Sequence, residues 1–247
     1  MLKCTQVSKR FGGLQALKNV DFTIESGEIA GLVGPNGSGK STLLNLISGV
    51  YKPDSGQILF LDEDISKLPP YRICAKGITK TAQTVQSFPE MTAVENVLTS
   101  VLFNKEKSTE RTDALLRAEE LLGFVGLSKE KFGVSAKSLN VVELRKIQLA
   151  KALATNPKLL LLDELLTGLT PKECDEAIEL IKQINKQGVT VLIVEHVMRV
   201  IMGLCNRVIV LHHGEKICEG TPQHVCNDQH VVKVYLGKRF LLSGEEE

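Results

Sequence analysis

The spacing of apolar residues changes along the chain from the alternation of β-strands to the wider period of helices. Alternation predicts half-buried strands, and short continuous apolar runs predict strands buried on both faces of a parallel sheet. The predicted strands are residues 3–11, 19–24, 28–33, 56–62, 158–164, 189–195, 207–211 and 216–220. The last two flank the sequence HHGE and predict a hairpin, in which His212 and His213 are exposed turn residues rather than metal ligands.

Helical spacing predominates from about Thr92 to Thr155, and Asn156-Pro157 ends it because the residue before a proline disfavours helix. A further helix is predicted between the apolar runs that end near residues 164 and 195. Strands alternating with helices indicate an α/β core with a parallel sheet, interrupted by a mostly helical insertion.

Composition narrows the classes of function. The chain of 247 residues is 43% hydrophobic and carries a net charge of +1, so no strong field favours nucleic acid, and no nucleic-acid partner is expected. Apolar runs such as Val191 to Val194 are too short to cross a bilayer, and the first residues lack the apolar stretch of a secretory signal. Six scattered cysteines without a C-x-x-C pair favour reduced thiols over a metal site.

The sequence GPNGSGKST matches the P-loop pattern G-x-x-x-x-G-K-[ST] between a predicted strand and a predicted helix. Its glycines allow backbone N–H groups to turn toward phosphates, and the following helix N-terminus adds partial positive charge. Lys40 is expected to reach the β- and γ-phosphates and Ser41 to ligate Mg²⁺. The expected nucleotide-binding residues here are Gly34, Pro35, Asn36, Gly37, Ser38, Gly39, Lys40, Ser41 and Thr42.

Together with the pattern of strands and helices, this motif predicts an α/β fold with a P-loop NTPase (RecA-like) core, an N-terminal antiparallel β-subdomain and a helical subdomain insertion. One domain over residues 1–247 is expected. Its nucleotide-binding core comprises 1–91 and 156–247, and its helical subdomain comprises 92–155.

Polar residues at the ends of the predicted strands supply the remaining chemistry. Asp163 and Glu164 follow an apolar strand, where Asp163 can hold Mg²⁺ and Glu164 can polarise the attacking water. His196 ends the next strand and can sense the γ-phosphate or orient water, although a lone histidine there is more often structural. Gln83 lies at the border of the helical insertion and can contact Mg²⁺ or water, but alone it is a weak signal.

The base-binding residues distinguish adenine from guanine. A guanine site needs Asn-Lys-x-Asp, and the stretches NKEK and NKQG both lack that aspartate. Adenine is therefore expected, stacked on an aromatic side chain near the N-terminus, for which Phe11 is the candidate. The alternative, that Phe11 is a core residue of a strand, is equally compatible with the sequence.

These motifs, in this order, resemble the ATP-binding cassette (ABC) ATPases from about Leu2 to Gly237. Within that superfamily the chain resembles the ATPase subunits of branched-chain amino acid importers. The matching stretches are VSKRFGGLQAL, GPNGSGKSTLLNLISG, TVQSFPEMTAVENVL, ALATNPKLLLLDE, GLTP, IVEHVMRVIMGLCNRVIVLHHGEKICEGTP and VYLG.

The resemblance implies an ATPase bound to the cytoplasmic face of a membrane, coupled to permease subunits and indirectly to a solute-binding protein. It places Phe11 against adenine, Gln83 where the cassette meets the permease, and Glu164 with His196 as the hydrolytic pair. It also implies a dimer with two ATP molecules, each lying between one chain's P-loop and the other chain's signature sequence, Leu-Ser-Gly-Gly-Gln.

The chain departs from that pattern at the signature. The aligned residues, here called the signature segment, are Leu139, Asn140, Val141, Val142 and Glu143. Leu165 also replaces the usual proline after Glu164, and 167–170 reads TGLT in place of the common D-loop sequence. Asn140 keeps a side-chain donor and forms a capping-box pattern with Glu143, which by itself indicates only a well-capped helix.

The two valines add β-branched bulk where backbone should approach phosphate. A lost bond to a charged phosphate is worth about 1.5–3 kcal/mol, so weakening one or two such bonds corresponds to a roughly ten- to thousandfold loss of closure or hydrolysis. Because a signature acts on the partner's ATP, a heterodimer with a cassette that has an intact signature is preferred over a homodimer. Two alternatives stay open: a cassette of a lipid exporter, and a nucleotide-binding regulator with little turnover.

Overall fold

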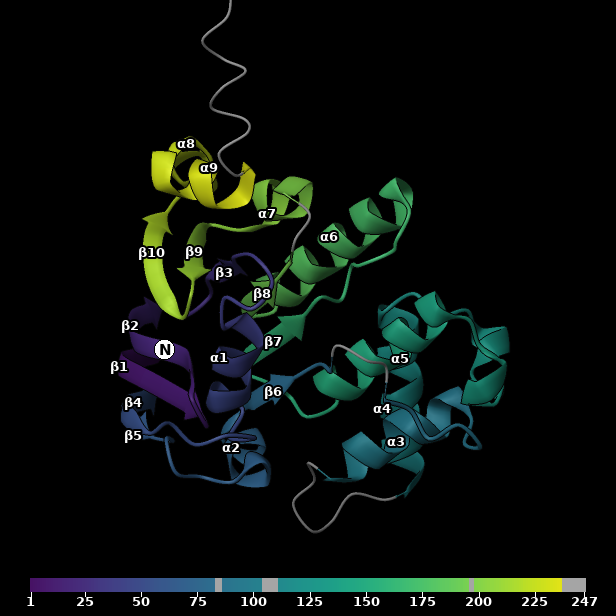
Figure 1. Cartoon of the computed structure of the whole chain (residues 1–247). Helices are drawn as coiled ribbons and strands as arrows, with labels where there is room; N and C mark the ends of the chain where they lie inside the picture. The colour runs from purple at the N-terminus through teal and green to yellow at the C-terminus, as the bar shows by residue number, and fades with distance from the viewer. Residues whose placement is uncertain (83–85, 104–110, 196–197, 237–247) are drawn as a thin grey trace, which may run out of the picture.

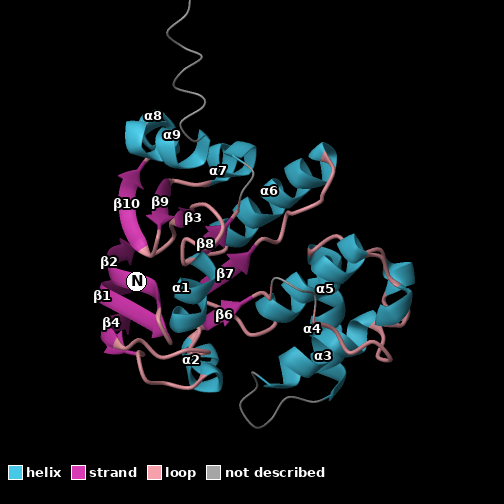
Figure 2. Ribbon diagram, viewed as in Figure 1, coloured by secondary structure: helices cyan, strands magenta, loops and turns pink. Residues whose placement is uncertain are grey.

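The computed structural model describes residues 1–82, 86–103, 111–195 and 198–236, and its elements form two sheets with helices between and around them (Figures 1 and 2). The first sheet is antiparallel, with the strand order β2-β1-β4-β5. Its strands are β1 (Leu2–Phe11), β2 (Leu14–Ile24), β4 (Ser55–Phe60) and β5 (Glu63–Asp64). This sheet is the predicted N-terminal antiparallel β-subdomain.

The second sheet has the order β10-β9-β3-β8-β7-β6, and its pairs are parallel except for the hairpin of β9 and β10. Its strands are β3 (Ile29–Val33), β6 (Ile78–Lys80), β7 (Leu159–Asp163), β8 (Thr190–Val194), β9 (Arg207–His212) and β10 (Glu215–Gly220). Strands β3, β7 and β8 are buried at every position, which explains their continuous apolar sequences.

Helix α1 (Lys40–Ile47) lies between the two sheets. Its leucines share one hydrophobic core with the antiparallel sheet and with alternate residues of the parallel strands, such as Leu159 and Leu161. The intervening residues, such as Leu160 and Leu162, face a second core that includes helices α6 (Pro171–Lys186) and α7 (Met198–Leu204). The parallel sheet is therefore covered on both faces, as βαβ connections require.

The helices of the insertion gather to one side of the parallel sheet (Figure 1). They are α3 (Ala93–Phe103), α4 (Arg111–Phe124) and α5 (Val141–Leu153), with short 3₁₀ turns at Lys129–Lys131 and Ala136–Ser138. The remaining helices are α2 (Pro70–Lys76), α8 (Pro222–Asn227) and α9 (Gln229–Leu236), the last two packing beside β10. No helix in the described part of the chain is long and apolar enough to span a membrane.

Most predicted elements are present, and the differences have local causes. The strand expected at 56–62 ends at Phe60, because Leu61 and Asp62 have positive φ and turn the chain into β5. The strand expected at 19–24 begins at Leu14, because β1 and β2 form one long hairpin around Gly12 and Gly13. His212 is the last residue of β9 and is half-buried, so only His213 is the exposed turn residue that was predicted for both.

Candidate nucleotide site

Three strands end at the same edge of the parallel sheet, and they carry the three predicted groups of site residues. Strand β8 lies between β3 and β7 and is parallel to both. The P-loop follows β3, Asp163 ends β7 and is followed by Glu164, and β8 ends at Val194, two residues before His196 in the sequence. The order of the strands thus brings together segments that are about 130 and 160 residues apart in the sequence.

The P-loop folds tightly around its glycines. Gly39 has φ of 105° and is the N-cap of α1, and a Cβ there would lie 2.6 Å from the carbonyl oxygen of Ala16. A Cβ at Gly34 would lie 2.2 Å from the carbonyl oxygen of Leu211. No acidic residue lies in the first turn of α1 and no side chain caps it, so the positive end of the helix dipole faces the loop.

Lys40 lies inside the loop. Its Nζ donates to the carbonyl oxygens of Gly34 at 2.8 Å and Pro35 at 3.1 Å. Burial lowers the pKa of Lys40, and the charges of Glu164 and Asp163 oppose that shift. The ammonium group is thus held by neutral carbonyls beside two carboxylates, where it can exchange carbonyl bonds for bonds to phosphate.

A cavity of about 550 Å³ opens over the P-loop, here called the nucleotide cavity. Its wall combines the start of β2, the loop and Glu164, and it contains Phe11, Leu14, Gln15, Ala16, Asn36, Gly37, Ser38, Gly39, Lys40, Ser41, Thr42 and Glu164. Phe11 is 40% exposed, so the alternative that it is a core residue is wrong. Its ring contacts Tyr51 edge-on, with centroids 5.1 Å apart, and Lys9 Nζ lies over the ring at 5.5 Å from its centroid.

Asp163 is buried, with 2% of its surface exposed, and its Oδ2 lies 3.1 Å from Lys80 Nζ. Lys80 also donates to Asn45 Oδ1 at 2.7 Å. Within the described residues, Asp163 Oδ1 and Ser38 Oγ are buried without a hydrogen-bond partner. Buried polar atoms are normally paired, so these two oxygens match a site that takes a cation and phosphate.

Glu164 lies next to Asp163 in a left-handed conformation, with φ of 51°, and its N–H donates to the carbonyl oxygen of Val194. A non-glycine residue in this region is strained, and such strain is concentrated at functional sites. The turn directs Glu164 out of the strand and into the wall of the nucleotide cavity. Its carboxylate can therefore reach a water molecule beside the bound phosphates.

Gln83 and His196 lie outside the described residues, so the structure describes only their neighbours in the sequence, Ala82 and Glu195. The carbonyl oxygen of Ala82 accepts a bond of 2.6 Å from Gln148 of α5, which links the segment before Gln83 to the helical insertion. Glu195, 1% exposed, accepts a bond of 2.8 Å from the backbone N–H of Leu166. The end of β8 is thereby tied to the segment that follows Glu164.

The signature segment begins α5 as a capping box, as predicted. Asn140 Oδ1 accepts from the backbone N–H of Glu143, and Glu143 Oε2 accepts from the backbone N–H of Asn140, both at 2.9 Å. Glu143 is also held by Lys131, whose Nζ lies 3.3 Å from Oε1. Val141 is 59% exposed and Val142 is half-buried, so one valine projects from the helix end.

Several residues at or beside the site were not predicted, among them Lys80, Tyr51 and Glu195. Lys80 ends β6, which is parallel to β7, and this pairing places its ammonium beside Asp163. A strand of three residues has no clear periodicity, so the sequence signals β6 only weakly. Glu195 directly precedes His196, and its position at a strand end was a signal that could have identified it.

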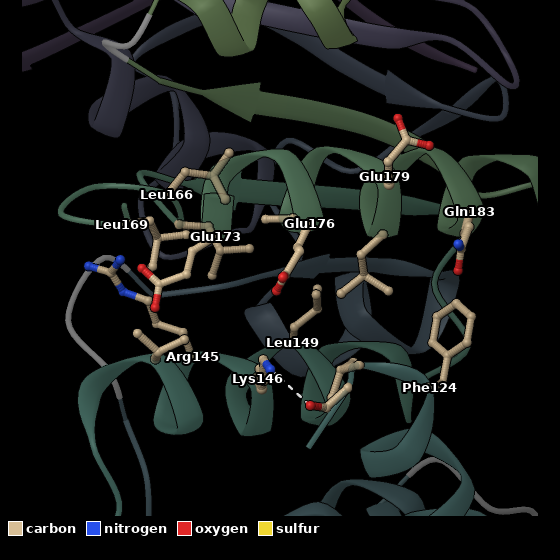
Figure 3. Close-up of a pocket in the computed structure, with 16 residues that line it drawn as sticks. Phe124, Arg145, Lys146, Leu149, Leu166, Leu169, Glu173, Glu176, Glu179 and Gln183 are labelled. Atoms are coloured by element: carbon tan, nitrogen blue, oxygen red, sulfur yellow. Dashed lines mark hydrogen bonds between the residues drawn. The ribbon is translucent and has the colours of Figure 1, made fainter. Parts of the chain in front are cut away.

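A second cavity, of about 490 Å³, separates α5 from α6 and is here called the α5–α6 groove (Figure 3). Its floor is apolar and includes Leu149, Leu166 and Leu169. Basic side chains of α5 face acidic side chains of α6 across it, and Lys146 donates to the carbonyl oxygen of Gly126 at 2.8 Å. The groove lies between the helical insertion and α6 of the core.

Comparison with known proteins decides the family. The family profile described as "ABC transporter" matches residues 17–167. The branched-chain amino acid transport ATP-binding protein LivG of Escherichia coli is 37% identical over 96% of this chain and 98% of its own length. The chain belongs to the ABC transporter family. As an ABC cassette it is an ATP-binding protein and an ATPase.

Other relatives of this ABC cassette differ in their transported solute. A second profile, "Branched-chain amino acid ATP-binding cassette transporter", matches residues 215–240. The branched-chain amino acid protein BraF of Pseudomonas aeruginosa is 34% identical, over 96% of this chain and 98% of its own length. The lipopolysaccharide export protein LptB of E. coli is 33% identical, over 98% of this chain and 99% of its own length.

Solved structures confirm the fold of the cassette. A cassette of an ABC transporter in its ADP conformation superimposes with a TM-score of 0.87, at 30% identity, over 96% of this chain and 99% of the other. A dimeric cassette in a post-hydrolysis state with ADP and phosphate gives a TM-score of 0.83, at 30% identity, over 90% of this chain and 99% of the other. Both are α/β cassettes, in agreement with the fold class predicted from the sequence.

Proposed function

We propose that this cassette is the energy-coupling subunit of an importer for branched-chain or other amino acids. Its nucleotide cavity, with Lys40 inside the P-loop and Glu164 in the wall, is the observation that carries the proposal of ATP hydrolysis. The profile matched at residues 215–240 and the similarity to LivG and BraF support the amino-acid branch.

The residues of the cavity have distinct roles in the proposed reaction. Adenine stacks on Phe11, while the P-loop N–H groups and Lys40 bind the phosphates. Glu164 accepts the proton of the attacking water, and Lys40 stabilises the charge that develops on the γ-phosphate. Gln83 and His196 are proposed to orient the water and to sense the phosphate.

Ser41 and Asp163 are proposed to hold Mg²⁺, with Gln83 as a further ligand. The buried Asp163 Oδ1, which has no hydrogen-bond partner among the described residues, fits a group that would hold Mg²⁺. When bound, the ion neutralises charge on the β- and γ-phosphates. Lys80 would balance the charge of Asp163 in the absence of the ion.

The proposed assembly is a heterodimer of two cassettes on the cytoplasmic face of a membrane, with two permease subunits and an external solute-binding protein. The heterodimer follows from the signature segment, because Val141 and Val142 weaken only the site of the partner's nucleotide. The site on this chain's P-loop would be completed by a partner with an intact signature.

Reconstitution in lipid vesicles tests the importer proposal. The cassette is purified with the permeases and the second cassette encoded beside it, and ATPase activity is measured with the solute-binding protein loaded with leucine or with no solute. Importer function predicts that the loaded protein stimulates hydrolysis and drives leucine uptake. Hydrolysis stimulated by lipopolysaccharide instead would favour the lipid-export alternative, which the similarity to LptB supports.

A further inference from the structure

Three side chains with metal-binding atoms meet beside α8, and none of them lines the nucleotide cavity. Cys218 comes from β10, His224 from α8, and Asp228 follows the last residue of α8. Their Sγ, imidazole nitrogen and carboxylate oxygen all lie within 4.8 Å of one another. Helices α8 and α9 pack at the end of the molecule where β10 ends, beyond α7 (Figure 1).

Asp228 is held in a fixed orientation by the start of α9. Its Oδ1 accepts from the backbone N–H groups of His230 at 2.9 Å and Val231 at 3.0 Å. Both bonds use the same oxygen, so they orient the carboxylate as an N-cap of the helix. A ligand that is already oriented loses little conformational entropy when it binds an ion.

The imidazole of His224 lies directly over Gly220. A Cβ on Gly220 would lie 2.6 Å from His224 Cδ2 and 3.2 Å from Cγ. Gly220 does not have a positive φ, so its backbone conformation does not require glycine. The close approach of the His224 ring does require glycine, because a side chain here would occupy the space of the imidazole beside Cys218.

Cys218 lies close to the carboxylates of Asp228 and Glu219. Burial raises the pKa of its thiol, and the charges of Asp228 and Glu219 raise it further. Its side chain is hydrogen-bonded to Asp228. A dication bound here would favour the thiolate, because a thiolate and a carboxylate together neutralise two positive charges.

We propose that Cys218, His224 and Asp228 form a zinc site, with a water molecule as fourth ligand. A sulfur, a nitrogen and an oxygen ligand suit Zn²⁺, and ligand atoms around a tetrahedral ion lie about 3.5 Å apart. The present spacing therefore needs a contraction of about 1 Å, within reach of side-chain rotation. On binding, the Cys218 S–H bond breaks, its proton passes to solvent, and a Zn–S bond forms.

The ion would tie β10 to α8 and α9, within the segment that the branched-chain cassette profile matches. The composition argued against a metal site because the cysteines lack C-x-x-C spacing. The ligands instead follow the spacing C-x₅-H-x₃-D, in which His224 lies in α8 and Asp228 directly follows that helix.

Titration of the full chain with Zn²⁺ and Co²⁺, after removal of metal by a chelator, tests the site. Wild type is expected to bind one Co²⁺ with a thiolate-to-cobalt charge-transfer band, and Zn²⁺ is expected to displace it and raise Tm. C218S is expected to lose the band, and H224A and D228N to weaken binding at least tenfold. C226S and H230A are the matched controls and are expected to retain both effects.

Retained binding of Mg-ATP shows that each variant is folded, since the cluster does not touch the nucleotide cavity. The proposal is overturned if wild type shows no band, or if C218S keeps the band. It is also overturned if C226S abolishes the band while C218S does not, because the thiolate would then belong to another cysteine.

Discussion

Glu164 combines two features at the scale of a single residue, a left-handed backbone and a carboxylate in the wall of the nucleotide cavity. The turn that strains this residue also places it in the wall of the nucleotide cavity. Replacing Glu164 with glutamine removes the charge of the side chain but keeps its shape, so the variant tests the chemical role without changing the fold.

Glu164→Gln is expected to lower kcat by at least about a hundredfold, because the general base is lost. Binding of ATP should stay within a few-fold of wild type, since the amide keeps the shape of the wall. Phosphate release and binding of a fluorescent ATP analogue are the measurements. Hydrolysis at the wild-type rate would remove the role assigned to Glu164.

Lys80 and Asp163 form a pair in which Asp163 is almost fully buried. Lys80→Met is expected to lower the free energy of unfolding by about 3 kcal/mol without nucleotide, because a buried carboxylate loses its partner. Mg-ATP should then raise Tm more in the variant than in wild type, since the ion replaces the lost charge. Thermal denaturation with and without Mg-ATP measures both effects.

Lys76→Met is the matched control, because Lys76 pairs with the exposed Glu63. Surface ion pairs contribute about 1 kcal/mol or less, so this variant should resemble wild type. An equal loss of stability in the two variants would contradict the account of Asp163.

At the scale of elements, the helix caps could be predicted from the sequence, whereas the short strands could not. Asn140 and Glu143 are three residues apart and form the capping box that their spacing predicts. Strand β6 has three residues and β5 has two, too few for a periodic pattern, and their pairing is decided by neighbouring strands. Lys80 was missed for this reason.

The cap at the start of α5 gives a stability prediction. Asn140→Ala is expected to lower the free energy of unfolding by about 1 kcal/mol, because the N–H of Glu143 loses its acceptor. Asn140→Asp should be close to neutral, since it keeps the accepting oxygen at the positive end of the helix. Urea denaturation measures both, and an Ala variant as stable as wild type would contradict the capping role.

The α5–α6 groove predicts motion between the helical insertion and the core. Basic residues of α5 face acidic residues of α6 across an apolar floor, so closing the groove would bury apolar surface and shorten charge separations. We expect Mg-ATP to close it. The chain has no tryptophan, so one introduced at Gln183 on the rim is a unique reporter.

In a Glu164→Gln background, Gln183→Trp should shift its emission to shorter wavelength on addition of Mg-ATP, as the indole leaves water. Lys186→Trp, on an exposed residue of the same helix outside the groove, should shift much less. Equal responses at both positions, or none at either, would contradict closure of the groove.

At the scale of the whole molecule, the strand order brings together motifs that are far apart in the sequence. Each motif signals itself locally: the glycines of the P-loop, the acidic pair after an apolar strand, and the polar end of the next strand. Their meeting depends on β8 lying between β3 and β7, which no local pattern specifies. The cluster of Cys218, His224 and Asp228 is the opposite case. The fold brings the three side chains together, but their spacing in the sequence matches no usual metal motif.

The central claim also lies at this scale: the P-loop site of this chain is complete, and its signature segment weakens the partner's site. A mixing experiment tests it with two forms of the chain. The first is wild type. The second combines Lys40→Ala, which disables its own P-loop, with Asn140→Ser, Val141→Gly and Val142→Gly, which restore the signature.

ATPase activity of the equimolar mixture, against each form alone, is the most direct measurement. The second form alone should be inactive and wild type alone should be slow. The mixture should exceed wild type by about ten- to a thousandfold, because a mixed dimer joins an intact P-loop to an intact signature. A mixture no faster than wild type alone would contradict the account.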